Sequence, residues 1–194
     1  MSRLRLLAAN PRLALGALLT LLLATAAVVG SGADFTASSA NPANTFASGT
    51  LSMVNSKEGT AVLSATNLKP TGTAVGTVDI QNTGSLSGAF TLARTTPVDS
   101  DTSNPMSAKL NLTVVDCGAF AGATPPTCGD GDDIVKFNGG TLAQMGTVGN
   151  PISPLGNYAA NEKHRYQFTV QLDGSAGNVY QGDSSSTEFD FNAS

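Results

Sequence analysis

The chain of 194 residues contains no tryptophan, one histidine and two cysteines, and only 6% of its residues are aromatic. Without tryptophan, and with its cysteines close together, it cannot carry the Cys…Trp…Cys pattern of immunoglobulin domains. The abundance of Ala, Gly, Ser, Thr and Asn indicates small side chains and many turns. Acidic residues outnumber basic ones, and the formal net charge is −4 at pH 7. A basic surface for nucleic acid or anionic lipid is therefore not expected.

The single histidine bears on enzymatic function. A catalytic zinc site needs about three protein ligands, typically His with Asp or Glu, and the sequence has no H-E-x-x-H motif. His164 stands beside two cations, Lys163 and Arg165, which would repel a metal ion, so we expect an exposed histidine at the start of a strand. No G-x-S-x-G or comparable signature supports a Ser-His-Asp triad. The sequence therefore predicts no catalytic residue and no cofactor, and favours a function other than catalysis.

One long hydrophobic run is present, at the N-terminus. Three arginines within residues 1–12 precede an uncharged segment, 13–33, rich in Leu, Ala and Val, which is typical of a secretory signal peptide. Small residues fit a cleavage site after Ala33, and Ala26 ends an earlier alternative. Because about 20 apolar residues can span a bilayer, an uncleaved membrane anchor is the other interpretation. Cleavage after Ala33 removes three of the ten Lys/Arg and none of the 14 Asp/Glu, so the formal net charge changes from −4 to −7, which suits an exported protein.

Beyond this run the sequence shows no lasting 3.6-residue apolar period. It shows alternation of period 2, interrupted by turn residues, together with loops at 118–133 and 146–156 and one helical turn at 141–145. We therefore predict an all-β domain over residues 45–194, an antiparallel β-sandwich of jelly-roll or immunoglobulin-like type. Strands are predicted at 46–54, 60–68, 73–81, 86–95, 109–117, 134–137, 165–172 and 188–193.

The loop 118–133 carries two candidate features. An oxidising compartment outside the membrane permits a disulfide between Cys117 and Cys128, and closing a loop of about 12 residues is worth about 3 kcal/mol in the chain-entropy model. Asp130, Asp132 and Asp133 gather the hard oxygen ligands that Ca²⁺ prefers. The loop lacks the closing glutamate of an EF-hand, so a solvated turn is the alternative to a calcium site.

The segment 34–44 lies between the predicted cleavage site and the domain. In its first part, 34–40, the apolar residues Phe35 and Ala37 alternate with polar residues, and Pro42 ends the pattern. Such a strand cannot bury its apolar side alone, so it is a candidate for strand addition to a neighbouring molecule, with Phe35 filling a pocket. A head-to-tail contact of this kind does not close on itself and generates a filament. The alternative is a terminus that is disordered or packs on its own domain. The residues predicted to form the donor interface are Asp34, Phe35, Thr36 and Ala37.

Four segments, taken in order, resemble one family. They are TFASGTL at 45–51, LKP at 68–70 leading to IQNTGSL at 80–86, YQG at 180–182, and FDF at 189–191. Their order and spacing resemble the TasA/camelysin family of exported bacterial proteins, over roughly residues 15–95 and 165–193.

The resemblance implies a jelly-roll or sandwich domain that is secreted through a dedicated signal peptidase. TasA-like members build extracellular biofilm-matrix fibres, whereas camelysin-like members are described as cell-surface metalloendopeptidases. Because the chain has one histidine, its residues favour the first class: a secreted structural protein of the cell surface or biofilm matrix that associates with itself. A camelysin-like metalloendopeptidase and a monomeric surface domain that binds glycan or protein are the alternatives. The expected partners are further copies of the chain and the signal peptidase; nucleic acid is not expected, and a membrane only through an uncleaved signal segment.

Overall fold

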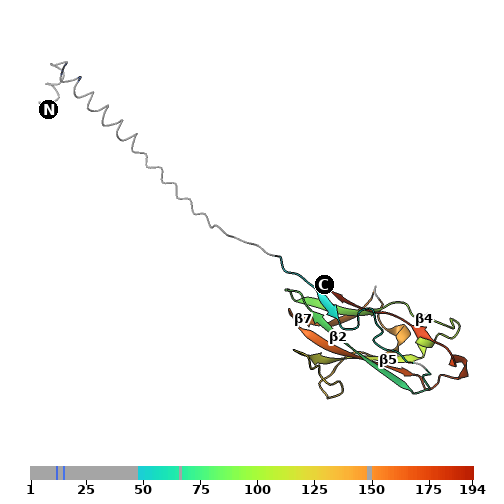
Figure 1. Cartoon of the computed structure of the whole chain (residues 1–194). Coiled ribbons are helices and arrows are strands. Elements are labelled where there is room, and N and C mark those ends of the chain that lie inside the picture. Colours follow the sequence, from blue (N-terminus) through green and yellow to red (C-terminus); the bar gives the residue numbers. More distant parts are fainter. Residues whose placement is uncertain (1–11, 13–14, 16–47, 66, 148–149) are drawn as a thin grey trace, which may run out of the picture. The chain divides into compact units, whose positions relative to one another are not determined.

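The computed structural model describes Arg12, Leu15 and residues 48–65, 67–147 and 150–194 (Figure 1). The chain divides into two units between Phe46 and Ala47, and the fold below is that of the second unit. Apart from Arg12 and Leu15, the predicted signal peptide lies outside the described residues, as do its cleavage site and the segment 34–44. Among the residues that are described, no helix is long and apolar enough to cross a membrane.

Antiparallel strands dominate the second unit, which confirms the all-β prediction. The strands are β1 (Met53–Asn55), β2 (Thr73–Asn82), β3 (Gly88–Arg94), β4 (Val98–Asp99), β5 (Leu110–Ala119), β6 (Ile134–Thr141), β7 (Ile152–Tyr158), β8 (Lys163–Leu172), β9 (Ser185–Ser186) and β10 (Phe189–Ala193). A five-stranded sheet has the order β1-β2-β8-β5-β6, a three-stranded sheet has the order β10-β3-β7, and β4 pairs with β9. The described residues of this unit also form three short 3₁₀ helices: η1 (Met106–Ala108), η2 (Leu142–Gln144) and η3 (Asn178–Tyr180).

Both larger sheets contribute to one hydrophobic core. Because alternate residues of a strand point to opposite faces, every second residue of β8 from Tyr166 to Leu172 is buried, as the alternation in the sequence predicts. Phe168 of β8 packs on Phe189 of β10, with ring centroids 4.6 Å apart, and this contact joins the two sheets. The buried cluster includes residues from β2, β3, β5, β7, β8 and β10.

Three stretches differ from the prediction. Of the predicted strand 46–54, the described residues 48–52 form no strand, and β1 begins only at Met53. The described residues of 60–68 form no strand, so that prediction is wrong. A Cβ on Gly76 of β2 would collide with the Val62 carbonyl, so this glycine lets the segment cross the sheet closely without joining its ladder. The predicted loop 146–156 contains most of β7. Pro154 hides the strand pattern there, and it is tolerated because β7 lies at a sheet edge. The helical turn predicted at 141–145 is confirmed as η2.

The described part of the domain begins against the β2–β3 turn. The Thr50 carbonyl accepts hydrogen bonds from the backbone N–H groups of Ser85 and Leu86, and the Thr50 N–H donates to Ser85 Oγ. A Cβ on Gly84 would collide with the Thr50 carbonyl, so glycine is needed for this close approach. Parts of two segments that carry the family resemblance are therefore in direct contact.

Candidate functional sites

A groove of about 680 Å³ lies between one edge of the five-stranded sheet and one edge of the three-stranded sheet. One wall consists of β1 and the segment 57–63, and the other is the segment 187–191, which includes the start of β10. Within the described residues, no backbone hydrogen bond joins the two walls. Large apolar side chains of the lining come from the margin of the core (Met53, Val62, Leu63 and Phe189) and, at Phe191, from the buried core itself.

The strand β10 forms an open edge beside this groove. Ser194 and Ala89 of the neighbouring β3 exchange both backbone hydrogen bonds, at 3.0 and 2.8 Å. Such pairs alternate along an antiparallel ladder, so the backbone groups of Phe189, Phe191 and Ala193 face away from β3. None of the described strands pairs with that side of β10. An edge with free N–H and C=O groups is a template for an added strand.

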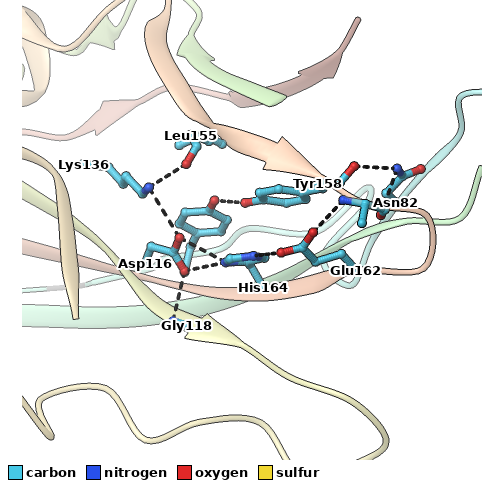
Figure 2. Close-up of polar contacts among 10 residues, drawn as sticks. Asn82, Asp116, Gly118, Lys136, Leu155, Tyr158, Glu162 and His164 are labelled. Carbon is cyan, nitrogen blue, oxygen red and sulfur yellow. Dashed lines mark hydrogen bonds and ion pairs between the residues drawn. The ribbon is translucent and has the colours of Figure 1, made fainter. Parts of the chain in front are cut away.

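On the side away from the groove, the single histidine, in the central strand β8 of the five-stranded sheet, lies in a polar network that reaches the edge strands β6 and β7 (Figure 2). Nδ1 of His164 is 2.9 and 3.0 Å from the two carboxylate oxygens of Asp116, and Nε2 is 3.0 Å from Oε1 of Glu162. The His164 side chain is 14% exposed and that of Asp116 is 2% exposed. The prediction of an exposed histidine is therefore wrong.

The neighbours of His164 in the sequence point to the other face of β8. Arg165 makes a two-bond ion pair with Asp79 of β2, at 2.7 and 3.0 Å, and Lys163 lies over an aromatic ring. Asp116 is 48 residues from His164 and reaches it only because β5 pairs with β8. The alternation of β8 could have indicated an inward histidine, but no local pattern in the sequence indicates its partner.

Hydrogen bonds at both ring nitrogens determine the protonation state of His164. A neutral imidazole has one donor and one acceptor nitrogen, so only the imidazolium can donate to two carboxylates. Burial alone lowers the pKa of His164, but the hydrogen bonds and charges of Asp116 and Glu162 outweigh it and raise this pKa. In this arrangement His164 has no lone pair to offer a zinc ion or a substrate proton.

The two carboxyl groups bonded to His164 have lowered pKa values, the opposite of the shift at the histidine. Burial favours a higher pKa for Asp116, yet the hydrogen bond from His164, the N–H of Gly118 and the charge of Lys136 together lower it. The hydrogen bond to His164 is the main cause of the lowered pKa of Glu162. Both carboxyl groups are therefore held in their ionised form around a positive ring.

Two tyrosines connect this network to the core. The ring of Tyr158 stacks on His164 and on Phe90, with centroid distances of 4.3 and 4.4 Å, and its hydroxyl hydrogen-bonds to that of Tyr166. Burial, followed by the charges of Asp116 and Glu162, raises the pKa of Tyr158. The Tyr158 hydroxyl therefore stays neutral.

Lys136 and Asn82 hold the neighbouring backbone. Lys136 of β6 donates to the Leu155 carbonyl of β7 at 2.5 Å and lies 3.5 Å from Asp116 Oδ2, so it bridges the two sheets. The side chain of Asn82 at the end of β2 is completely buried. Its amide donates to three backbone carbonyls, and its oxygen accepts the Gly84 N–H. The three carbonyls, at 2.8 to 3.1 Å, belong to Leu86, Tyr158 and Ala159.

The end of β5 and the loop that follows it contain the predicted disulfide and calcium-site residues. Cys117 and Cys128 form a disulfide, which confirms that prediction. Each of Asp130, Asp132 and Asp133 offers a carboxylate oxygen within 4.8 Å of the others. A hydrogen bond with Asp132, together with its negative charge, raises the pKa of Asp130. The calcium site stays a prediction, because exposed acids on a turn adopt such spacing with or without a cation.

Comparison of the chain with models of known protein families and with curated protein sequences finds no match. The resemblance to the TasA/camelysin family therefore stays a prediction that rests on four short segments. The groove and the histidine network remain the two structural features from which a function can be argued.

Proposed function

We propose that this is an exported structural protein of the cell surface or biofilm matrix, whose β-sandwich domain associates with further copies by β-strand addition. One observation carries the proposal: the groove beside β10 combines apolar side chains with an open strand edge. Main-chain hydrogen bonds supply the affinity of such a contact, and alternate side-chain pockets supply its specificity.

The proposed donor is the segment 34–40, set free by cleavage after Ala33. Seven extended residues reach about 23 Å at about 3.3 Å per residue, which is longer than the five residues of β10. Phe35 is the one large apolar side chain of the donor, and Phe189 and Phe191 offer it an aromatic surface in the groove.

Charge contributes little to this contact. Cleavage after Ala33 would create a positively charged amino group on Asp34, and the carboxylate of the same residue balances it, so the donor segment 34–40 has no net charge. The groove lining carries Glu58, Glu188 and Asp190 against Lys57. We therefore expect assembly to depend only weakly on ionic strength.

The first experiment compares the mature protein with a version that lacks residues 34–40. We expect the intact protein to form filaments visible by electron microscopy and the deletion to remain monomeric by light scattering. Phe35→Ser should lower assembly strongly while the domain stays folded. Val75→Ser is the matched control, because Val75 is 58% exposed on the outer face of β2, away from the groove. Filaments from the deletion would overturn strand addition.

The second experiment tests the acceptor. A labelled peptide covering residues 34–43 should bind the deleted protein, and Leu63→Lys in the groove should weaken that binding at least tenfold. If the peptide binds but the intact protein stays monomeric at all concentrations, the segment occupies its own groove and the filament proposal fails.

The enzyme alternative has its own test. The metalloendopeptidase interpretation requires a metal ligand set, and both nitrogens of His164 already bond to carboxylates. We expect the purified protein to contain no stoichiometric zinc and not to cleave casein. Zinc at one equivalent, with cleavage that a chelator abolishes, would contradict the structural function.

A further inference from the structure

Independently of self-association, we propose that His164 is a pH-sensitive clamp. Its protonated ring ties Asp116 of β5 to Glu162 in the β7–β8 turn, and loss of the proton as pH rises releases that turn. The turn matters because β7 belongs to the three-stranded sheet and β8 to the five-stranded sheet. A contact that fixes it therefore fixes the two sheets to each other.

The surroundings of His164 contain few other groups that titrate. Asp116 comes from β5, Lys136 from β6, Tyr158 from β7, Glu162 from the turn and Tyr166 from β8. On β2, the charged residue Asp79 pairs with Arg165 on the other face of β8. The network around the ring thus holds two negative charges and two positive charges when His164 is protonated. When His164 loses its proton, one of the two negative carboxylates no longer has a positively charged partner.

The geometry indicates which contact breaks. The Asp116 side chain is 2% exposed, so leaving it without the histidine proton is costly, whereas Glu162 is 30% exposed and can turn to water. The remaining proton therefore stays on Nδ1, facing Asp116, and Nε2 repels Glu162. Glu162 also accepts the Ala159 N–H at 2.5 Å. When the carboxylate moves away, this hydrogen bond within the turn is lost as well.

The direction of the pH dependence follows from the raised pKa of His164. A proton bound more tightly in the folded state stabilises fully below the ordinary imidazole pKa of about 6.5, and this stability is lost as pH rises through the folded value. The lowered pKa values of Asp116 and Glu162 act at the acidic end. Their contribution is present above the ordinary carboxyl pKa of about 4 and is lost as pH falls through the folded values. The stability that these three groups contribute is therefore greatest between about pH 4 and 6.5.

The chain offers an unusually clear background for measuring this effect. It has one histidine and two cysteines, and both cysteines are in the disulfide. Between pH 6 and 9 the only other group that normally titrates is the α-amino group, with a pKa of about 7.7 to 8.0. Since every variant shares that group, differences between variants report His164.

The first measurement follows the His164 ring in the intact, disulfide-bonded protein by NMR from pH 5 to 10. We expect both ring nitrogens to be protonated at pH 6 and the ring to titrate above 6.5. A ring that titrates at or below 6.5, or that carries one proton at pH 6, would overturn the clamp. This measurement requires no substitution.

The second measurement is the thermal midpoint from pH 5 to 9. We expect the wild-type midpoint to fall by at least about 3 °C between pH 6 and 9, and Glu162→Gln or His164→Gln to lose most of that slope. Asp79→Asn is the control, because it breaks an ion pair on the opposite face of the same strand and should keep the wild-type slope. Amide hydrogen exchange at 159–164 should quicken at least tenfold over the same range. An unchanged slope in Glu162→Gln, or faster exchange spread evenly over the domain, would contradict the proposal.

Discussion

The edges of the two larger sheets come together in two places, and the described residues bridge the sheets by polar side chains at only one of them. Along β6 and β7, polar side chains bridge the sheets: Lys136 reaches the Leu155 carbonyl, and Asp116 holds both Lys136 and His164. Along β1 and β10, a groove separates the edges, and no backbone hydrogen bond crosses it among the described residues. One side is completed within the chain, whereas the other keeps apolar surface and strand edge accessible.

The difference shows how a domain with a small core can hold its sheets together and still present an open edge. Buried charges are costly unless each one is paired, so the network near His164 tolerates little displacement. The groove has no such requirement, because the main-chain groups at its edge can bond to water. The rigid network near His164 would then limit how far the strands β1 and β10 can move apart at the groove.

The largest expected effect comes from Asp116→Ala, which breaks the closed side. This change leaves His164 and Lys136 without their buried counter-charge, and breaking a buried pair in this way typically costs about 3 to 5 kcal/mol. Denaturant unfolding measures the loss. Asp190→Ala, on the wall of the groove, is the control and should cost less than about 1 kcal/mol. Similar losses for the two variants would remove the contrast between the sides.

Asn82→Ala should have the next largest effect. The change leaves three carbonyls and one N–H without their buried partner, and the expected cost is about 3 kcal/mol. Asn192→Ala is the matched control, because Asn192 is exposed on β10. Urea unfolding of both variants checks this. A loss at Asn82 no greater than at Asn192 would show that the corner is held by other contacts.

Removal of the disulfide should cost somewhat less. The paired change Cys117→Ala and Cys128→Ala opens a loop of about 12 residues, worth about 2 to 3 kcal/mol. Because Cys117 follows Asp116, and the Gly118 N–H donates to Asp116, we expect the loss to be non-additive with Asp116→Ala. A double-mutant cycle measures this coupling. Strict additivity would mean that the loop and the ion network stabilise the domain separately.

The smallest effect on stability is expected from Ala193→Pro on the open side. Its N–H faces away from β3, so proline removes no internal hydrogen bond and should change the free energy of unfolding by less than about 1 kcal/mol. The same change removes a donor that an added strand would use, so assembly should weaken measurably in light scattering. The opposite pattern, a large loss of stability with normal assembly, would show that this edge is internal to the domain.

Prediction from the sequence succeeded where the signal was local. The alternation in 165–172 predicted the buried face of β8, and the expected export of a chain with only two cysteines predicted the disulfide between Cys117 and Cys128. It failed at 60–68, because Gly76 lets that segment cross the sheet without pairing, and Gly76 lies outside the segment itself. It also failed at β7, where Pro154 conceals a strand that lies at an edge.

His164 shows which properties of the protein the sequence determined and which only the tertiary structure decided. The sequence alone determined that there is one imidazole, an acidic balance of charge and a chain of short strands, because composition and period are local properties. Only the tertiary structure decided that the ring lies between two carboxylates. The pairing of β5 with β8 brings Asp116 across 48 residues, while the pleat turns Lys163 and Arg165 to the other face. The open edge of β10 is likewise a product of sheet order, which no single segment encodes.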